Sequence, residues 1–164
     1  MSFDEHDLRA ANRGGARISA LEIAAVLERR PEIESALRMI PPEASLLSPA
    51  AAIPWTPLTR LLDAFGGIRG VGFSKTTKAL HPKRPALIPM LDSVVQEYLG
   101  DYPGPRSSLS FGERATALVR SYKRDLDRNR SALRALRREL ERRGYPLTEV
   151  RLLDVVIWSV AADD

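Results

Sequence analysis

The chain has 164 residues, of which 44% are hydrophobic and 28% charged, and its formal net charge is +4. This length fits one domain with a sizeable core, and no apolar stretch approaches the ~20 residues of a membrane-spanning helix. With no cysteine and only His6 and His81, disulfides and thiolate metal sites are excluded, and we expect neither a metal nor another cofactor. The acidic, non-apolar N-terminus lacks the pattern of a secretory signal, so we expect a cytoplasmic protein with no membrane association.

Helix capping and periodicity signals recur along the chain, whereas alternating β-branched runs are almost absent. The sequence therefore predicts an all-α fold of six to eight helices in one compact domain over residues 1–164. A capping box of Ser19 and Glu22 begins a helix that continues to about Glu28. A second helix follows over about 32–39, and the proline-rich stretch after it is irregular, with room for one short helical turn.

The second half of the chain contains further helical patterns. A helix is predicted over residues 93–99. A longer pattern begins with a capping box of Ser110 and Glu113 and covers residues 110–144, either as one helix or as two with a break near 127–130. The last helix, over about 148–161, is apolar on most faces, so we expect it to be buried in the core. Basic helices thus occupy about 110–161.

Positive charge is concentrated in the stretch from Arg120 to Arg143. It holds ten basic and four acidic residues, a local excess of +6 that exceeds the charge of the whole chain. Such a stripe attracts phosphates, although a solvated helix face has the same composition.

Residues 57–99 form the predicted core of a helix-hairpin-helix motif. Its first helix opens with Thr56 as N-cap and Pro57 at the first helical position, and it ends at Gly66. The second helix begins near Phe73.

The turn between these helices contains Gly70, Val71 and Gly72. Glycines allow positive φ angles and the close approach of another backbone, while Val71 would anchor the turn in the core. The unpaired N–H groups that open the next helix can bind a phosphate, and Lys75 and Lys78 add positive charge nearby. Such contacts hold a nucleic-acid backbone without reading its bases. The sequence therefore predicts a sequence-tolerant interaction with DNA.

The segment IRGVGFSKTTKAL followed by IPMLDSVV resembles the core of the helix-hairpin-helix DNA glycosylases, the superfamily of the adenine and endonuclease III type repair enzymes. In that family a hairpin of L-P-G-V-G-x-x-T-A type is followed, 22 residues after its first glycine, by an aspartate in an apolar-Pro-apolar-apolar-Asp context. Gly70 and Asp92 have this spacing, and IPMLD is this context. The resemblance implies that Asp92 is catalytic, stabilising the sugar cation or activating water once the base is flipped out. It also implies phosphate contacts at Gly70, Gly72 and Ser74.

Ser74 occupies the position at which bifunctional members of that family carry the lysine that forms a Schiff base with the sugar. Lys75 is one residue further along, and ~100° of helix rotation would direct it to a different side. The resemblance therefore implies a monofunctional enzyme, which removes a base without cutting the strand. Arg69 replaces the usual proline, and the match covers about 27 of the 164 residues.

A second resemblance extends over nearly the whole chain. The segments ARISALEIAAVL, HPKRPALIP with LDSVV, and LLDVVIW are similar to a group of uncharacterised bacterial proteins that share a domain of unknown function. This resemblance implies no activity. It marks Lys83, Arg84 and Pro85 as a recurrent feature, either a solvated loop or a loop beside Asp92 that holds a phosphate or orients the carboxylate.

Asp92 also has a purely structural interpretation, because an aspartate that begins a helix is a normal N-cap worth roughly 1 kcal/mol. Trp55 and Trp158 lie in apolar surroundings and are expected in the core, and we assign His81 no catalytic role. Two hypotheses remain. Either the chain is a DNA-binding protein of the base-excision type that hydrolyses an N-glycosidic bond with Asp92, or it is a non-enzymatic DNA-binding or protein-interaction module. Self-assembly through the C-terminal helices is left open.

Overall fold

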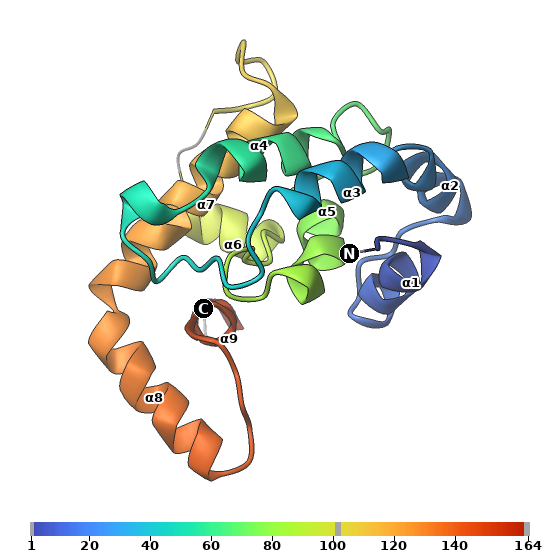
Figure 1. Cartoon of the computed structure of the whole chain (residues 1–164). Helices are drawn as coiled ribbons and strands as arrows, with labels where there is room; N and C mark the ends of the chain where they lie inside the picture. The colour runs from blue at the N-terminus through green and yellow to red at the C-terminus, as the bar shows by residue number, and fades with distance from the viewer. Residues whose placement is uncertain (1, 101–102, 163–164) are drawn as a thin grey trace.

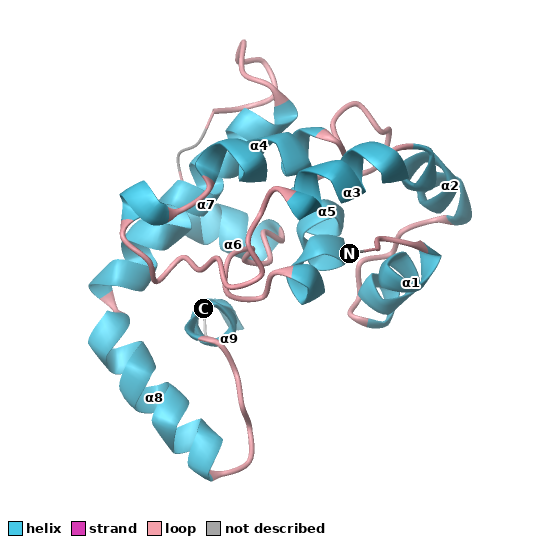
Figure 2. Ribbon diagram, in the orientation of Figure 1, coloured by secondary structure: helices cyan, strands magenta, loops and turns pink. Residues whose placement is uncertain are grey.

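The computed structural model describes residues 2–100 and 103–162. Within these ranges it has nine α-helices, two short 3-10 helices and no strand, which confirms the all-α prediction (Figures 1 and 2). The α-helices are α1 (Glu5–Arg13), α2 (Ala20–Glu28), α3 (Arg30–Arg38), α4 (Trp55–Asp63), α5 (Phe73–Leu80), α6 (Ser93–Leu99), α7 (Phe111–Arg128), α8 (Arg130–Arg142) and α9 (Glu149–Ala162). The 3-10 helices are η1 (Ala50–Ala52) and η2 (His81–Lys83). None of the helices described combines the length and apolar character needed to cross a bilayer.

Reciprocal capping boxes begin two helices as predicted. Ser19 Oγ accepts a hydrogen bond from the Glu22 backbone N–H while the Glu22 carboxylate accepts one from the Ser19 N–H, and Ser110 and Glu113 do the same at α7. The expected start of α4 was wrong. This helix begins at Trp55 with no side-chain cap, so Thr56 lies inside it.

The N-terminal helix α1 was not predicted. Asp4 caps it, with Asp7 completing a capping box in place of the usual glutamate or glutamine. An aspartate at this position is a weaker sequence signal than the usual longer acid, and the described residues hold nine α-helices rather than six to eight.

A single residue separates α7 from α8. Asn129 leaves helical geometry at φ −99° and ψ 9°, and its side-chain amide donates to the Asp125 carbonyl oxygen at 2.9 Å. Asparagine bonds to nearby backbone in this way and so competes with helix continuation. The 110–144 pattern is therefore two helices, with the break inside the stretch where the sequence allowed one.

The core is built where α4 packs on α7, α1 packs on α5, and α9 packs on α6 and α8 (Figure 1). The expectation that α9 is buried on most faces was wrong. Leu152, Leu153 and Ile157 are buried, but the side chains of Trp158 and Val160 are 48% and 57% exposed. The reason is that α9 packs mainly against α6 and α8, with a smaller contact to α7, and its remaining face is open to solvent.

The segment that follows α4 carries the predicted turn. Residues 64–72 lead into α5, and Gly67 and Gly70 have positive φ angles of 75° and 82°. Val71 is 6% exposed, so it anchors the turn in the core as expected. This arrangement places α5 against α1, with the chain then running through η2 toward Asp92 (Figure 2).

Candidate functional site

Asp92 is the N-cap of α6. Its backbone is extended (φ −76°, ψ 178°), and its Oδ1 atom accepts a hydrogen bond from the Val95 N–H at 3.1 Å. An aspartate satisfies one of the otherwise unpaired N–H groups of the first turn in this way. The structural role considered for Asp92 is therefore present in the fold.

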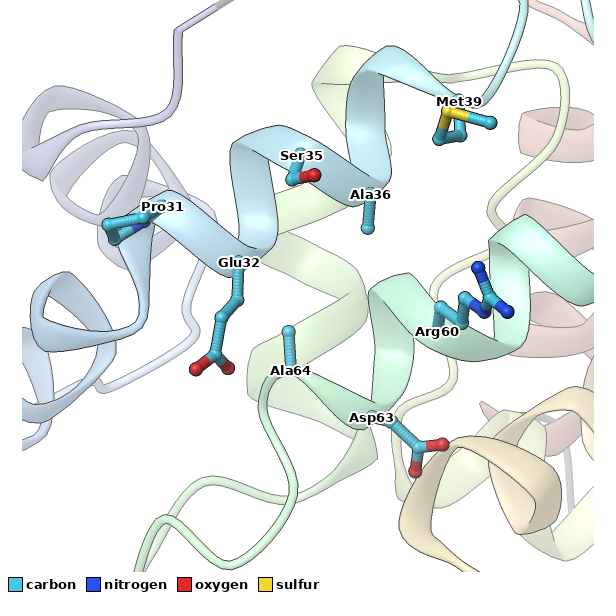
Figure 3. Close-up of a pocket in the computed structure, with 8 residues that line it drawn as sticks. All are labelled: Pro31, Glu32, Ser35, Ala36, Met39, Arg60, Asp63 and Ala64. Atoms are coloured by element: carbon cyan, nitrogen blue, oxygen red, sulfur yellow. The ribbon is translucent and has the colours of Figure 1, made fainter.

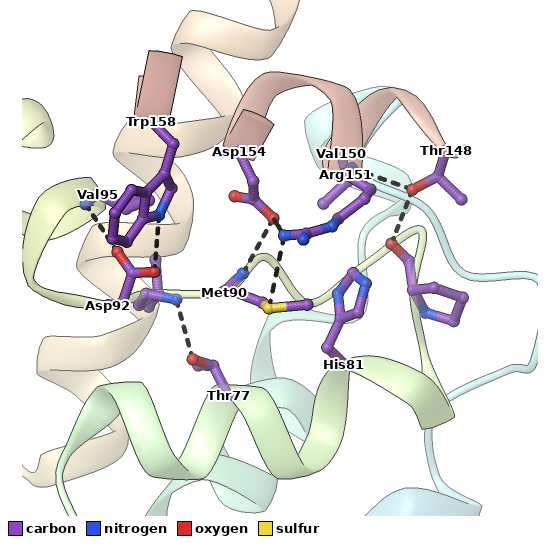
Figure 4. Close-up of polar contacts among 12 residues, drawn as sticks. Thr77, His81, Met90, Asp92, Val95, Thr148, Val150, Arg151, Asp154 and Trp158 are labelled. Atoms are coloured by element: carbon purple, nitrogen blue, oxygen red, sulfur yellow. Dashed lines mark hydrogen bonds and ion pairs between the residues drawn. The ribbon is translucent and has the colours of Figure 1, made fainter. Parts of the chain in front are cut away.

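The second carboxylate oxygen of Asp92 has a partner from the other end of the chain. Trp158 on α9 donates its indole Nε1–H to Asp92 Oδ2 at 3.0 Å (Figure 4). Only 8% of Asp92 is exposed. A carboxylate has about four lone-pair sites, so each oxygen can still accept a further hydrogen bond. Asp92 is thus held in a fixed orientation while keeping its capacity to interact with a ligand.

Hydrogen bonds fix the segment before Asp92 against α5. The Leu91 N–H donates to Thr77 Oγ1 at 2.9 Å, and that hydroxyl donates to the Phe73 carbonyl oxygen at 2.8 Å. The Gln96 side-chain amide donates to the Leu91 carbonyl oxygen at 2.7 Å. The position of Asp92 is therefore tied to the helix that follows the hairpin.

A second aspartate lies behind the site. Asp154 on α9 is 1% exposed, and its Oδ2 lies 3.5 Å from the Met90 backbone nitrogen and 3.8 Å from Arg151 Nη1. Burial, with a smaller contribution from the charge of Asp92, raises the pKa of Asp154 to about 7.

The hydroxyl of Tyr122 accommodates a neutral Asp154, although the hydrogen bond between these side chains lowers the pKa of Asp154 and so opposes the larger effect of burial. Its Oη lies 2.5 Å from the Val150 carbonyl oxygen and 2.9 Å from Asp154 Oδ1. A tyrosine hydroxyl has one proton, which it can donate to only one of the two oxygens. When it donates to Val150, a protonated Asp154 can donate to the Tyr122 oxygen, so both short contacts become hydrogen bonds.

Asp92 lines a cavity of about 280 Å³, which we call the Asp92 cavity. Its other lining residues are Gly14, Lys78, Met90, Arg151, Val155 and Trp158. Two cations and an indole ring thus surround one carboxylate. Among the described residues, Lys78 has no hydrogen bond or ion pair, whereas Arg151 contacts Asp154 and the Met90 sulfur. The cavity therefore offers an acceptor on Asp92, an uncommitted amine on Lys78 and an aromatic surface on Trp158. Figure 4 shows Asp92 and Trp158 side by side.

The predicted hairpin residues lie at the start of α5. Gly70 and Gly72 are exposed, and Gly72 is the N-cap of the helix without a side-chain cap. Gly70 is in close contact with α2, because a Cβ added there would lie 2.2 Å from Glu22 Oε1. Ser74 is half-buried one helical turn before Lys78, so these two residues lie on the same side of α5. One side of α5 therefore extends from the hairpin, at Ser74, to the Asp92 cavity, at Lys78.

Three of the predicted phosphate-binding cations are used inside the protein. Lys75 Nζ pairs with the Glu22 carboxylate at 2.7 Å, and its hydrogen bonds lower the pKa of Glu22. Lys83 Nζ pairs with Asp7 at 2.8 Å. Arg84 is 2% exposed, and its guanidinium donates to the backbone carbonyl oxygens of α3 and the segment after it, at Leu37 (3.1 Å) and Ile40 (2.7 Å).

The sequence profile of a family of unknown function (DUF6308) matches residues 1–161. The chain belongs to this family. No curated protein and no solved structure matches it. The expected similarity to an uncharacterised family is therefore confirmed.

The DUF6308 chain has a larger groove on another face, between α3 and α4, with a volume of about 570 Å³ (Figure 3). One of its charged members, Asp63, already has partners in the protein, since its carboxylate accepts hydrogen bonds from the Gly112 N–H at 2.6 Å and the Ser110 hydroxyl at 3.1 Å. None of the sequence-predicted residues lines this groove. The described residues also contain no group of three or more histidines and acids placed to hold a metal ion.

Sequence reasoning missed the contribution of α9 to the site. Trp158 was expected in the core but is 48% exposed beside Asp92, and Trp55 is half-buried with the Arg120 guanidinium 4.1 Å above its ring. A usable signal was present, because Asp154 interrupts an otherwise apolar helical run and a buried acid needs partners.

His81 is buried with Nδ1 2.6 Å from the Ile88 carbonyl oxygen, a contact that holds the loop before Asp92.

Proposed function

We propose that this protein binds DNA through the hairpin and receives an extruded nucleotide in the Asp92 cavity, where Asp92 supports hydrolysis of the N-glycosidic bond. The observation that carries the proposal is the shared side of α5, on which Ser74 near the hairpin and Lys78 in the cavity are separated by one turn, about 6 Å of rise. The resemblance of residues 68–94 to the helix-hairpin-helix DNA glycosylases points the same way.

The proposed binding surface contains fewer residues than the sequence alone predicted. It consists of Gly70, Gly72 and Ser74 at the start of α5, together with Lys78. Backbone N–H groups at the first turn of a helix hold a phosphate, and the uncommitted amine of Lys78 adds a cationic contact. Lys75, Lys83 and Arg84 are left out because their charges are engaged within the protein.

In the proposed reaction, the bond between the sugar C1′ and the base nitrogen breaks and its electron pair leaves with the base. Water then adds to C1′, its proton is lost, and the departing base gains a proton, so the overall step is a hydrolysis. The negative charge of Asp92 stabilises the positive charge that develops on the sugar. Trp158 presents an indole face on which an extruded base can stack.

A second candidate function is a DNA-binding or protein-interaction module without catalysis. It is favoured by the geometry of Asp92, since one oxygen caps α6, the other accepts from Trp158, and only 8% of the residue is exposed. In that case the carboxylate is needed only to join α6 to α9.

The two candidates are separated by release of free base from oligonucleotides that carry uracil, alkylated, deaminated or oxidised bases. The wild type is expected to release base from at least one substrate and to leave an abasic site that breaks only after alkali, without a borohydride-trapped complex. Asp92→Asn is the matched variant, because its side-chain oxygen can still cap α6, although its NH2 group replaces the oxygen that accepts from Trp158. It should bind DNA as the wild type does and release no base.

Two results would go against the enzymatic proposal. Undiminished release by Asp92→Asn would contradict the role of Asp92, and no release by the wild type from any of the four substrate classes would favour the module. Failure of the wild type to bind duplex and single-stranded DNA at ~50 mM salt, where phosphate contacts are strongest, would contradict DNA binding itself.

A further inference from the structure

An apolar groove lies on the face of the molecule formed by α6, α8 and α9. Its volume is about 200 Å³. Its lining includes the apolar or aromatic side chains of Tyr98, Leu133, Leu136, Val156, Ile157 and Val160. We call this surface the C-terminal groove.

Four of the side chains that line the walls of the C-terminal groove are partly exposed to solvent. Tyr98 is 50% exposed, Leu136 38%, Val156 36% and Val160 57%. Leu133 and Ile157 are buried beneath them and form its floor. Scattered apolar side chains are normal on a surface, but a continuous set that surrounds a depression marks an interaction site.

The charge beside the groove indicates what can bind there. Between Arg128 and Arg143, the sequence that includes α8 has seven arginines and two glutamates. Three of these arginines pair with Asp125, Asp127 and Glu149, so this stretch and its ion-pair partners have a net charge of +2. A second copy of this chain docked groove to groove would bring this charge against itself, which is unfavourable. A partner with carboxylates beside its apolar residues would instead have the complementary charge.

We propose that the C-terminal groove binds an amphipathic helix of another protein, with apolar side chains on one face and aspartates or glutamates at its flanks. Helix-in-groove binding places anchors at i, i+3 or i+4, and i+7 into a groove of this kind. A nucleic acid is a weaker fit, because phosphates would use the arginines but leave the exposed apolar walls without a role.

The test measures fluorescence anisotropy of labelled ~16-residue helical peptides titrated with the full chain. The panel places leucines at i, i+3, i+7 or at i, i+4, i+7, and fills the other positions with glutamate, glutamine or lysine. At ~50 mM salt, a glutamate peptide should bind at least tenfold more tightly than its glutamine counterpart, and the lysine peptide should not bind. The preference should shrink strongly at ~500 mM salt.

Two groove variants and one control locate the binding surface. Val160→Glu and Leu136→Glu place a charge on the exposed walls and should weaken the glutamate peptide at least tenfold. Leu21→Glu changes a side chain on α2 that is 84% exposed, and it should leave binding within twofold of the wild type. Circular dichroism of each variant confirms that it is folded.

Four outcomes would overturn the proposal. They are no binding of any glutamate peptide up to ~1 mM, equal binding of glutamate and lysine peptides, groove variants that bind as well as the wild type, and a wild-type dimer in sedimentation velocity that Val160→Glu converts to a monomer. The last result would show that the occupant is a second copy of the chain. A surface that binds only DNA would bind none of the glutamate peptides, which is the first of these outcomes.

Discussion

Trp158 joins α9 to the start of α6 by donating its indole N–H to Asp92 at 3.0 Å. The two residues are 66 positions apart in the chain. Because Asp92 also holds the Val95 N–H, one carboxylate connects a helix cap with the packing of the last helix. Loss of the indole N–H should therefore weaken both the cap of α6 and the packing of α9.

Trp158→Phe tests this connection, since it keeps an aromatic ring and removes the donor. We expect a loss of about 1 kcal/mol in the free energy of unfolding, the usual contribution of one such hydrogen bond at a partly exposed position. Urea denaturation of the wild type, Trp158→Phe, Asp92→Ala and the double variant gives a double-mutant cycle. The coupling energy should be about 1 kcal/mol. Additive losses in the cycle would show that the two side chains do not interact.

The raised pKa of Asp154 makes stability depend on pH. Its pKa is about 7 in the folded protein and 3.8 in the ordinary reference state, so the folded protein binds the extra proton between these values. Stability from this group is therefore full at low pH and is lost as pH rises from about 4 to about 7, by up to about 4 kcal/mol. Asp154→Asn, which resembles the protonated acid, should lose this dependence and be more stable than the wild type at pH 8.

His81 provides a check on that interpretation. Burial lowers the pKa of His81, so its contribution has the opposite sign and stability from it rises as pH increases toward 6.5. Because His81 is present in both proteins, the difference between wild type and Asp154→Asn isolates the aspartate. Urea unfolding of both proteins at pH 5, 6, 7 and 8 measures this difference in the free energy of unfolding. A difference that stays constant across this range would contradict the raised pKa.

Lys78 and Lys75 should differ in their effect on DNA binding. Lys78→Ala is expected to weaken binding several-fold and to reduce the slope of log affinity against log salt by about 0.9, the value for one lost phosphate contact. Lys75→Ala removes a charge already paired with Glu22, so the slope should change little. The measurement is a titration of a labelled duplex between ~50 and ~200 mM salt. Equal effects of the two substitutions would place the DNA elsewhere.

Gly70 and Gly67 offer a matched pair for the hairpin. Both have positive φ angles, so alanine at either position should cost about 1 kcal/mol in backbone strain. Only at Gly70 would the new Cβ meet another group, Glu22 Oε1 at 2.2 Å, and force this carboxylate away from Lys75. Gly70→Ala should therefore be the more destabilising by about 1 kcal/mol or more in thermal and urea unfolding. Equal losses would indicate that Glu22 moves without cost.

Local signals were sufficient to predict most helices and the cap formed by Asp92. The capping boxes at Ser19 and Ser110, the break before α8 and the burial of Val71 depend on residues close together in sequence, and each is present in the structure. The start of α4 at Trp55 was not predictable in the same way, because no side chain caps it.

The contacts around Asp92 could not be predicted, because they are made between distant segments. Nothing local indicates that Trp158 donates to Asp92, or that Glu22 and Asp7 neutralise Lys75 and Lys83. A lysine in a basic segment has the same local sequence whether it binds a phosphate or a carboxylate. Which of the two it binds is decided by tertiary packing.

Each of the three N-terminal helices has a polar contact with one later segment of the chain. Lys83 pairs with Asp7 at α1, Lys75 with Glu22 on α2, and Arg84 with the carbonyl oxygens at the end of α3. During synthesis, α1, α2 and α3 leave the ribosome before these three side chains exist, so the ion pairs and hydrogen bonds that they make can form only after Arg84 has emerged. The first forty residues are thus a part of the protein that is made early but completes its polar contacts late.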